Sequence, residues 1–182
     1  MADPLRLIVL DRDGVINKDS ESLIRSVDEW DPIPGSMEAI ARLCRQGWTV
    51  AIATNQAAVG RRSLKVPDLE AIHALMCRQA EALGGHISII EYCPHPPEAN
   101  CDCRKPKPGL FRNIARRLGL ADLQGVPVVG DRQRDLEAGM ALGCRPFLVT
   151  TGHGQQSLQE PLPKGTRVFA NLAAVVDALL AE

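Results

Sequence analysis

The chain has 182 residues, of which 45% are hydrophobic and 3% aromatic, and its formal net charge is −1. This length favours a single domain, residues 1–182, with a largely aliphatic core. The near-neutral charge gives no electrostatic reason to expect a nucleic acid or an anionic membrane as partner. No apolar run approaches the about 20 residues that span a bilayer, and the start, MADPLRL, lacks the features of a signal peptide. We expect a soluble, cytoplasmic protein, and its small polar surface favours a monomer.

Short apolar runs alternate with helical patterns along the chain. Strands are expected at residues 5–10, 48–53, 86–92, 126–129 and 146–150, with a weaker one at 167–169. Helices are expected to begin near Ser36 and to cover 67–83, 108–118, 135–142 and 172–180. This alternation predicts βαβ units and therefore one doubly wound, mainly parallel, Rossmann-like α/β sheet. The Gly/Gln/Pro loop 151–165 carries no recognisable chemistry.

Polar residues follow several of these strands directly. Asp11 and Asp13 follow the first strand, Thr54 and Asn55 end the second, and Asp131 follows the fourth. Because the carboxyl ends of neighbouring parallel strands meet at one crevice, we expect these side chains to lie together. Lys105, in the loop after the third strand, is able to reach the same crevice.

These residue types suit phosphoryl transfer. The carboxylates of Asp11 and Asp13, one residue apart, repel each other unless a cation lies between them or one is protonated. Acids hold Mg²⁺, which prefers oxygen ligands, whereas a hydroxyl, an amide and an ammonium stabilise phosphoryl oxygens. Taken singly, Thr54, Asn55 and Lys105 are better explained as helix caps or solvated loop residues. Their joint occurrence at matching strand ends favours a catalytic site.

Four motifs resemble the signatures of haloacid dehalogenase-type phosphatases, in order DRDGVIN, TNQ, CRKPKPG and GDRQRD. The resemblance covers nearly the whole chain and implies an aspartyl-phosphate mechanism. Asp11 would attack phosphorus, and Asp13 would protonate the leaving alkoxide and then activate water. Mg²⁺ would be held by the side chains of Asp11 and Asp131 and by the backbone carbonyl of Asp13.

The same resemblance assigns further roles. Thr54 and Lys105 would hold the transferring phosphoryl group, and Asp135 would either orient Lys105 or hold a metal-bound water.

The gaps after the first and third strands are too short for a separate cap domain. The crevice is therefore expected to be covered only by the loops 15–34 and 93–103.

The loop 93–103 carries a cluster of soft ligands. Cys93, His95, Cys101 and Cys103 form a recognised closed set for a structural Zn²⁺. In a reducing cytosol this spacing favours metal over four unrelated loop residues. Binding of Cys103 would aim Arg104 and Lys105 at the crevice. The remaining cysteines, at 44, 77 and 144, are expected to be small buried hydrophobes.

This zinc loop is similar to that of two related phosphatase groups, which act on a heptose bisphosphate and on histidinol phosphate. The segments KPKPGLF and VDEWDPIPGSMEAIARL are more similar to the heptose group. That resemblance implies removal of the 7-phosphate of a heptose 1,7-bisphosphate, a sugar-phosphate substrate of lipopolysaccharide precursor synthesis, with the anomer left open. Candidate substrate contacts are Asn55, Arg104, Arg132, Asp19 and Ser22.

Two functions of other classes compete with a phosphatase. A phospho-acceptor receiver domain also has an acceptor aspartate, a Thr and a Lys in a doubly wound sheet, but has no general acid corresponding to Asp13. A nucleic-acid-binding knuckle would explain the Cys/His loop, but the neutral charge and scarce aromatics oppose it. Histidinol phosphate remains the competing substrate.

Overall fold

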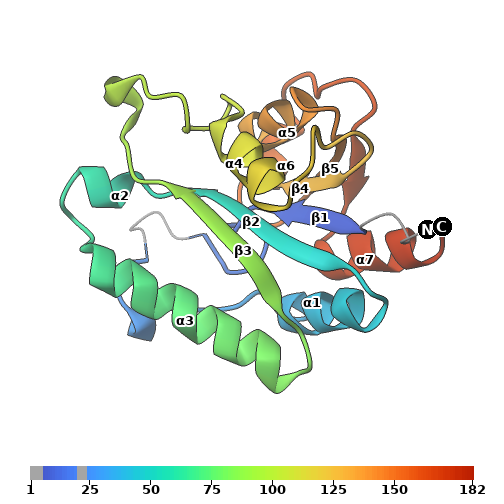
Figure 1. The fold of residues 1–182 in the computed structure, drawn as a ribbon, viewed down its shortest axis with the longest axis horizontal. Coiled ribbons are helices and arrows are strands. Elements are labelled where there is room, and N and C mark those ends of the chain that lie inside the picture. The colour runs from blue at the N-terminus through green and yellow to red at the C-terminus, as the bar shows by residue number, and fades with distance from the viewer. Residues whose placement is uncertain (1–5, 20–23) are drawn as a thin grey trace.

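The computed structural model describes residues 6–19 and 24–182. Its centre is a six-stranded sheet of order β3-β2-β1-β4-β5-β6 (Figure 1), and neighbouring strands are parallel throughout. The strands are β1 (Leu7–Leu10), β2 (Thr49–Asn55), β3 (Ile87–Cys93), β4 (Pro127–Gly130), β5 (Arg145–Val149) and β6 (Arg167–Phe169). This order confirms the predicted doubly wound α/β fold.

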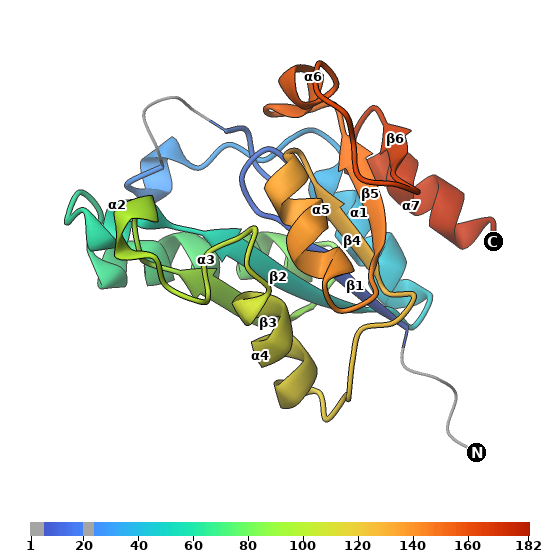
Figure 2. The same cartoon turned by 90° about the horizontal axis from the view of Figure 1, so that it is seen from above.

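Helices cover both faces of the sheet. On one face lie α1 (Ser36–Arg45), α3 (Val66–Ala82) and α7 (Leu172–Leu180). On the other lie α4 (Gly109–Arg117) and α5 (Gln133–Met140), which stand in front of the sheet in Figure 2. Each helical layer buries the sheet face that it covers, so the molecule has three layers and two apolar cores.

The uniform apolarity of β1 follows from this layering. Ile8 and Leu10 belong to the core under α1, α3 and α7, whereas Leu7 and Val9 belong to the core under α4. Because successive side chains of a strand point to opposite faces, a strand covered on both sides has no polar face. Strand β1 lies between β2 and β4, so its carboxyl end, followed by Asp11, lies near the middle of the sheet.

Several short helices were not predicted from the sequence. They are η1 (Val27–Glu29), α2 (Ala57–Gly60), η2 (Pro97–Ala99) and α6 (Gly154–Ser157). Helix α5 begins at Gln133, two residues earlier than predicted, because the Asp135 carboxylate accepts from the backbone N–H of Arg132 at 3.0 Å. Within the two described ranges, no helix has the length and apolarity needed to cross a bilayer.

Candidate active site

Three carboxylates converge where β1 and β4 end. One oxygen from each of Asp11, Asp131 and Asp135 lies within 4.8 Å of the other two. All three residues are buried. Asp11 and Asp131 come directly after their strands, while Asp135 projects from the first turn of α5. The predicted convergence of strand ends is therefore present, and Asp135 joins it.

Lys105 contacts two of the three acids in this cluster. Its Nζ is 3.0 Å from an Asp11 oxygen, 2.8 Å from an Asp135 oxygen, and donates to the Ala53 carbonyl at 2.7 Å. Burial alone would lower the pKa of Lys105, but the two carboxylates outweigh it and hold the pKa above its ordinary value. The lysine is therefore a permanent ammonium beside the predicted nucleophile.

One ammonium does not balance three buried carboxylates. Burial, opposed by Lys105 and reinforced by the neighbouring acids, raises the pKa of Asp11 to about 6. Burial together with Asp135 and Asp11 raises the pKa of Asp131 to about 8. Ionised together, the three acids and the lysine carry a net charge of −2, which a divalent cation would neutralise. The residues thus fit an oxygen-bound Mg²⁺, with Asp11 and Asp131 as its side-chain ligands.

Two glycines allow close approach to Asp131. A Cβ added at Gly14 would lie 2.2 Å from a carboxylate oxygen of Asp131, and one at Gly152 would lie 2.3 Å from the same oxygen. Both glycines have positive φ, at 81° and 56°. Only glycine therefore fits at either position, and the backbone packs directly on the predicted metal ligand.

The loop that follows β5 surrounds Asp131, although the sequence indicated no chemistry there. The backbone N–H of His153 donates to the Asp131 carboxylate at 2.7 Å, and the Ser157 hydroxyl donates to the Asp131 carbonyl at 2.8 Å. The Thr151 hydroxyl donates to the Gly14 carbonyl at 2.6 Å. Each of these bonds joins segments far apart in the sequence, so a residue pattern does not reveal the contacts of this loop.

Asp13 has a set of partners separate from the acidic cluster. The Arg12 guanidinium, 1% exposed, donates to both Asp13 oxygens, at 2.9 and 3.2 Å. Asn17 donates to one oxygen at 3.0 Å and Gln56 to the other at 2.8 Å. Burial opposes ionisation of Asp13, but Arg12 and these hydrogen bonds hold its pKa below the ordinary value. Arg12, Asn17 and Gln56 are site residues that sequence reasoning did not identify.

A neutral histidine, His73, forms a hydrogen bond with Arg12. The NH1 group of Arg12 lies 3.1 Å from His73 Nε2. Burial and the nearby guanidinium lower the pKa of His73 to about 3, so the imidazole is uncharged and accepts this hydrogen bond. The position of His73 on α3 ties that helix to the Arg12–Asp13 pair.

The two residues that end β2 differ in their surroundings. Thr54 is buried, and its hydroxyl accepts from the Gln56 amide at 3.0 Å. The Asn55 side chain accepts from the backbone N–H of Lys105 at 3.1 Å and donates to its carbonyl at 3.2 Å. Both ends of the Asn55 amide thus hold Lys105, and its predicted substrate contact stays a prediction.

The outer candidates lie at the rim of the crevice. Asp19 pairs with Arg132 at 3.4 Å and with His153 Nε2 at 2.9 Å, which joins the 15–34 loop to the loop after β5. Arg104 donates to the His95 carbonyl at 3.1 Å. Ser22, the last predicted substrate contact, lies outside the described residues.

The four zinc-ligand candidates form one compact cluster. The Sγ of Cys103 lies 3.1 Å from that of Cys93 and 3.5 Å from that of Cys101, and the Cys93–Cys101 separation is 3.6 Å. His95 Nδ1 lies 3.3 Å from Cys103 Sγ and 3.7 Å from Cys93 Sγ. Tetrahedral zinc with Zn–S bonds of about 2.3 Å places its ligand atoms roughly 3.5 to 3.8 Å apart. The cluster fits such an ion, with all four positions filled by protein.

The zinc loop is packed against two helices through glycine. A Cβ at Gly60 of α2 would lie 2.5 Å from the Pro94 carbonyl oxygen, and one at Gly109 of α4 would lie 2.4 Å from the Asp102 carbonyl oxygen. The backbone N–H of Gly60 donates to Pro94 at 2.8 Å. The loop is thereby held in place immediately before Lys105.

Comparison with known proteins identifies close relatives. The HAD-hydrolase-like family model matches residues 102–175. The chain is 53% identical to the D-glycero-beta-D-manno-heptose-1,7-bisphosphate 7-phosphatase of Pseudomonas aeruginosa, covering 96% of this chain and 97% of that protein. Identity to the corresponding Bordetella bronchiseptica enzyme is 51%, covering 98% and 99% of the two chains.

Solved structures of heptose 1,7-bisphosphate phosphatases are also similar to this chain. The D,D-heptose 1,7-bisphosphate phosphatase of B. bronchiseptica, crystallised with magnesium and phosphate, superposes with a TM-score of 0.95 at 50% identity, covering 97% of this chain and 99% of that one. The heptose bisphosphate phosphatase of Burkholderia thailandensis has a TM-score of 0.77 at 43% identity, with coverage of 97% and 99%.

We predict that replacing Cys101 and Cys103 with serine removes zinc and destabilises the protein. Because the metal joins four residues of one loop, its loss should lower the thermal midpoint by roughly 5 °C or more, as expected for about 2 kcal/mol. Metal analysis and thermal unfolding check this. Cys77→Ser, outside the cluster, should keep full zinc content; wild-type protein free of zinc would contradict the prediction.

We predict that Mg²⁺ binds more tightly as the pH rises from about 6 to about 8, the range set by Asp11 and Asp131. Metal must displace the Asp131 proton, so affinity should rise about tenfold per pH unit. The folded state holds protons that the unfolded chain releases, so without metal its stability falls as the pH rises from about 4 to about 8.

Calorimetric titration with Mg²⁺ and thermal unfolding at several pH values measure both effects. Asp31→Asn provides a matched control, because Asp31 is an exposed carboxylate paired with Lys18. That variant should behave as wild type. A Mg²⁺ affinity that does not change with pH would show that the buried acids are already ionised.

Proposed function

The chain belongs to the D-glycero-beta-D-manno-heptose-1,7-bisphosphate 7-phosphatase family of HAD-like hydrolases, and we propose that it removes the 7-phosphate from that bisphosphate. The observation that carries the proposal is the buried acidic cluster with Lys105 in contact with Asp11. Such a site binds a divalent cation and presents a carboxylate to phosphorus. The relatives' names support the beta anomer, and their family supports a location in the cytoplasm; the monomeric state stays a prediction.

Asp11 is the proposed nucleophile. Its oxygen 3.0 Å from Lys105 Nζ is oriented by the ammonium, which also draws charge from the transferring phosphoryl group. Magnesium, when bound by Asp11, Asp131 and the Asp13 backbone, supplies charge neutralisation that lets an anionic ester approach an anionic carboxylate. The Thr54 hydroxyl stabilises a phosphoryl oxygen from the end of β2.

Asp13 is the proposed general acid and base. Because the pKa of Asp13 is held low, Asp13 must first take up a proton. It gives this proton to the sugar oxygen as the bond from that oxygen to phosphorus breaks and the Asp11 acyl phosphate forms. The resulting Asp13 carboxylate then takes a proton from water, which attacks phosphorus and frees Asp11. Arg12, Asn17 and Gln56, from the segments after β1 and β2, orient this carboxyl group by hydrogen bonds.

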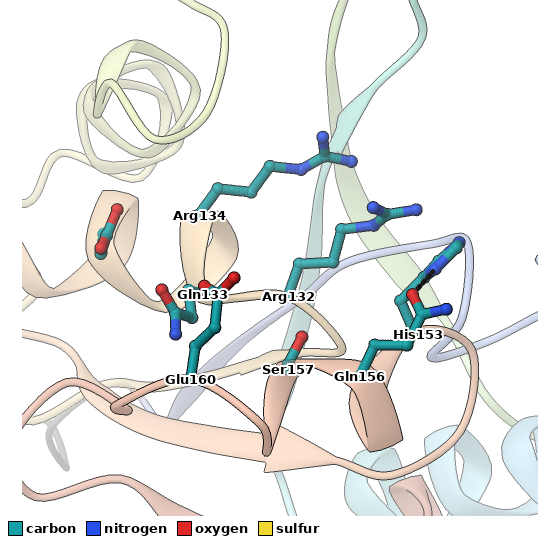
Figure 3. A pocket seen from close by; sticks show the side chains of 8 residues that line it. Arg132, Gln133, Arg134, His153, Gln156, Ser157 and Glu160 are labelled. Carbon is teal, nitrogen blue, oxygen red and sulfur yellow. Dashed lines mark hydrogen bonds between the residues drawn. The ribbon is translucent and has the colours of Figure 1, made fainter.

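The second phosphate of a bisphosphate needs cations beyond the crevice. A cavity of about 370 Å³ beside Asp131 is lined by Arg132, Gln133, Arg134, Glu137, His153, Gln156, Ser157 and Glu160. Figure 3 shows the side chains of Arg132 and Arg134 extended in the same direction from the start of α5. Arg132 already pairs with Asp19, whereas the Nε of Arg134 has no hydrogen-bond partner among the described residues. These features support Arg134 as a contact for the second phosphate.

We predict that Asp11→Asn lowers phosphate release from the heptose bisphosphate by at least about 1,000-fold, because an amide is not a nucleophile toward phosphorus. Acid-quenched wild-type enzyme should carry a phosphoryl adduct that the variant lacks, as measured by mass spectrometry. Asp31→Asn should retain activity. Near-normal turnover by Asp11→Asn would refute the nucleophile assignment.

We predict that Arg134→Ala raises the KM for the bisphosphate about tenfold to a hundredfold, the loss of one charge-assisted contact. The KM for a monophosphate such as p-nitrophenyl phosphate should hardly change. Steady-state kinetics on both esters measure this. Arg116→Ala, a substitution on α4, serves as control; equal effects of Arg134→Ala on both esters would exclude a role in binding the second phosphate.

A further inference from the structure

We propose that Gln56 is a positioning residue that aligns the general acid Asp13 and the hydroxyl of Thr54 through one amide group; this inference rests on the proposed phosphatase function. Gln56 follows β2 and is 5% exposed. Its Nε2 lies 2.8 Å from Asp13 Oδ2 and 3.0 Å from Thr54 Oγ1. Of the two residues that it joins, Thr54 lies on β2 and Asp13 lies in the loop after β1.

The chemistry of Asp13 fixes the orientation of this amide. An ionised carboxylate only accepts hydrogen bonds, so the group that faces it must be a donor. A rotated Gln56 would place its carbonyl oxygen about 2.8 Å from the Asp13 carboxylate, where two acceptors repel. The amide nitrogen therefore faces Asp13.

The hydrogen count of the amide then fixes the role of Thr54. An amide nitrogen has two hydrogens, and here one is donated to Asp13 and the other to Thr54. Because Thr54 accepts this bond, its own hydroxyl hydrogen points elsewhere. In the described part of the chain no protein group accepts that hydrogen, which leaves it available to a phosphoryl oxygen in the crevice.

Asp13 depends on Gln56 in a different way. One carboxylate oxygen, Oδ1, accepts from Arg12 at 2.9 Å and from Asn17 at 3.0 Å. The other, Oδ2, accepts from Gln56 at 2.8 Å and from Arg12 only at 3.2 Å. Without Gln56, Oδ2 would retain only the longer of its two bonds, and the carboxyl plane would be held from one side. The acid would then be less well placed to protonate a leaving oxygen.

The two effects differ in the esters that they slow. An alkoxide leaving group needs a proton from Asp13, whereas a nitrophenolate leaves without one. Poor alignment of Asp13 should therefore slow cleavage of the ester bond, reported by kcat/KM, for a sugar phosphate and not for an aryl phosphate, whereas the later hydrolysis of the Asp11 acyl phosphate is common to both esters. A misdirected Thr54 hydroxyl should slow both equally, because it stabilises the phosphoryl group itself.

The experiment measures kcat and KM of Gln56→Leu on the heptose bisphosphate and on p-nitrophenyl phosphate. We expect kcat/KM to fall about 100-fold on the sugar ester and about tenfold on the aryl ester, because kcat/KM reports the step that breaks the ester bond. In a Thr54→Val background, Gln56→Leu should no longer lower kcat/KM for the aryl ester, since that loss acts through the hydroxyl.

Equal losses on both esters, or losses that add in the double variant, would overturn the proposal and leave Gln56 with a structural role. Gln79→Leu, which removes an amide bonded to Trp30 at 2.8 Å, is the matched control and should leave both rates unchanged. Thermal unfolding reports whether the variants fold, and Gln56→Met replaces the leucine variant if that one does not.

The outcome is separable from that of the proposed function. Wild-type enzyme that hydrolyses fructose 1,6-bisphosphate and p-nitrophenyl phosphate but not the heptose bisphosphate would refute only the substrate. The Gln56 comparison would then be made on the fructose ester with the same expected ratios. Wild-type enzyme that hydrolyses none of these esters would refute both.

Discussion

The excess of three buried carboxylates over one buried ammonium determines the pKa values of the candidate site and its affinity for a cation. Charges removed from water are tolerated only when opposite charge and hydrogen bonds replace the solvent. Lys105 supplies part of that replacement to Asp11 and Asp135, and the remaining deficit raises the pKa of Asp131 to about 8. The same deficit defines the ligand that the site accepts, a divalent cation followed by a phosphate ester. The same buried charges therefore affect both the stability of the fold and the binding of the cation.

Several neighbouring parts of the structure fix the position of Lys105. The Asn55 amide holds the backbone of Lys105 on both sides, and the zinc loop ends two residues before it. Gly60 and Gly109 let two helices pack against that loop at backbone distance. The zinc cluster has no open coordination position, so its effect on catalysis passes through the placement of Lys105 and Arg104. Only Arg104 therefore separates the last ligand of the closed metal cluster from Lys105 of the candidate catalytic site.

The parts of the structure that depend on residue type could be predicted from the sequence, and the parts that depend on backbone contacts could not. Buried strands and the acids that end them were recognisable because both leave a linear pattern, as did the Cys/His spacing. The roles of Arg12 and Gln56 could not be predicted because they depend on how the folded backbone directs each side chain toward Asp13. The contacts of His153 and Thr151 were missed because they are backbone bonds or depend on distant segments meeting. Asn55 illustrates the same limit, since its type was noted but its partner, the Lys105 backbone, is fifty residues away.

The contacts of His153 have a consequence for how this enzyme can diversify. Its main-chain N–H orients Asp131, a task that any residue except proline performs equally well. Its imidazole pairs with Asp19, at the edge of the loop that borders the crevice. Mutation at this position can therefore change the shape and charge of the entrance while the metal ligand keeps its hydrogen bond. Single substitutions of His153 can therefore change the range of substrates without changing the reaction chemistry.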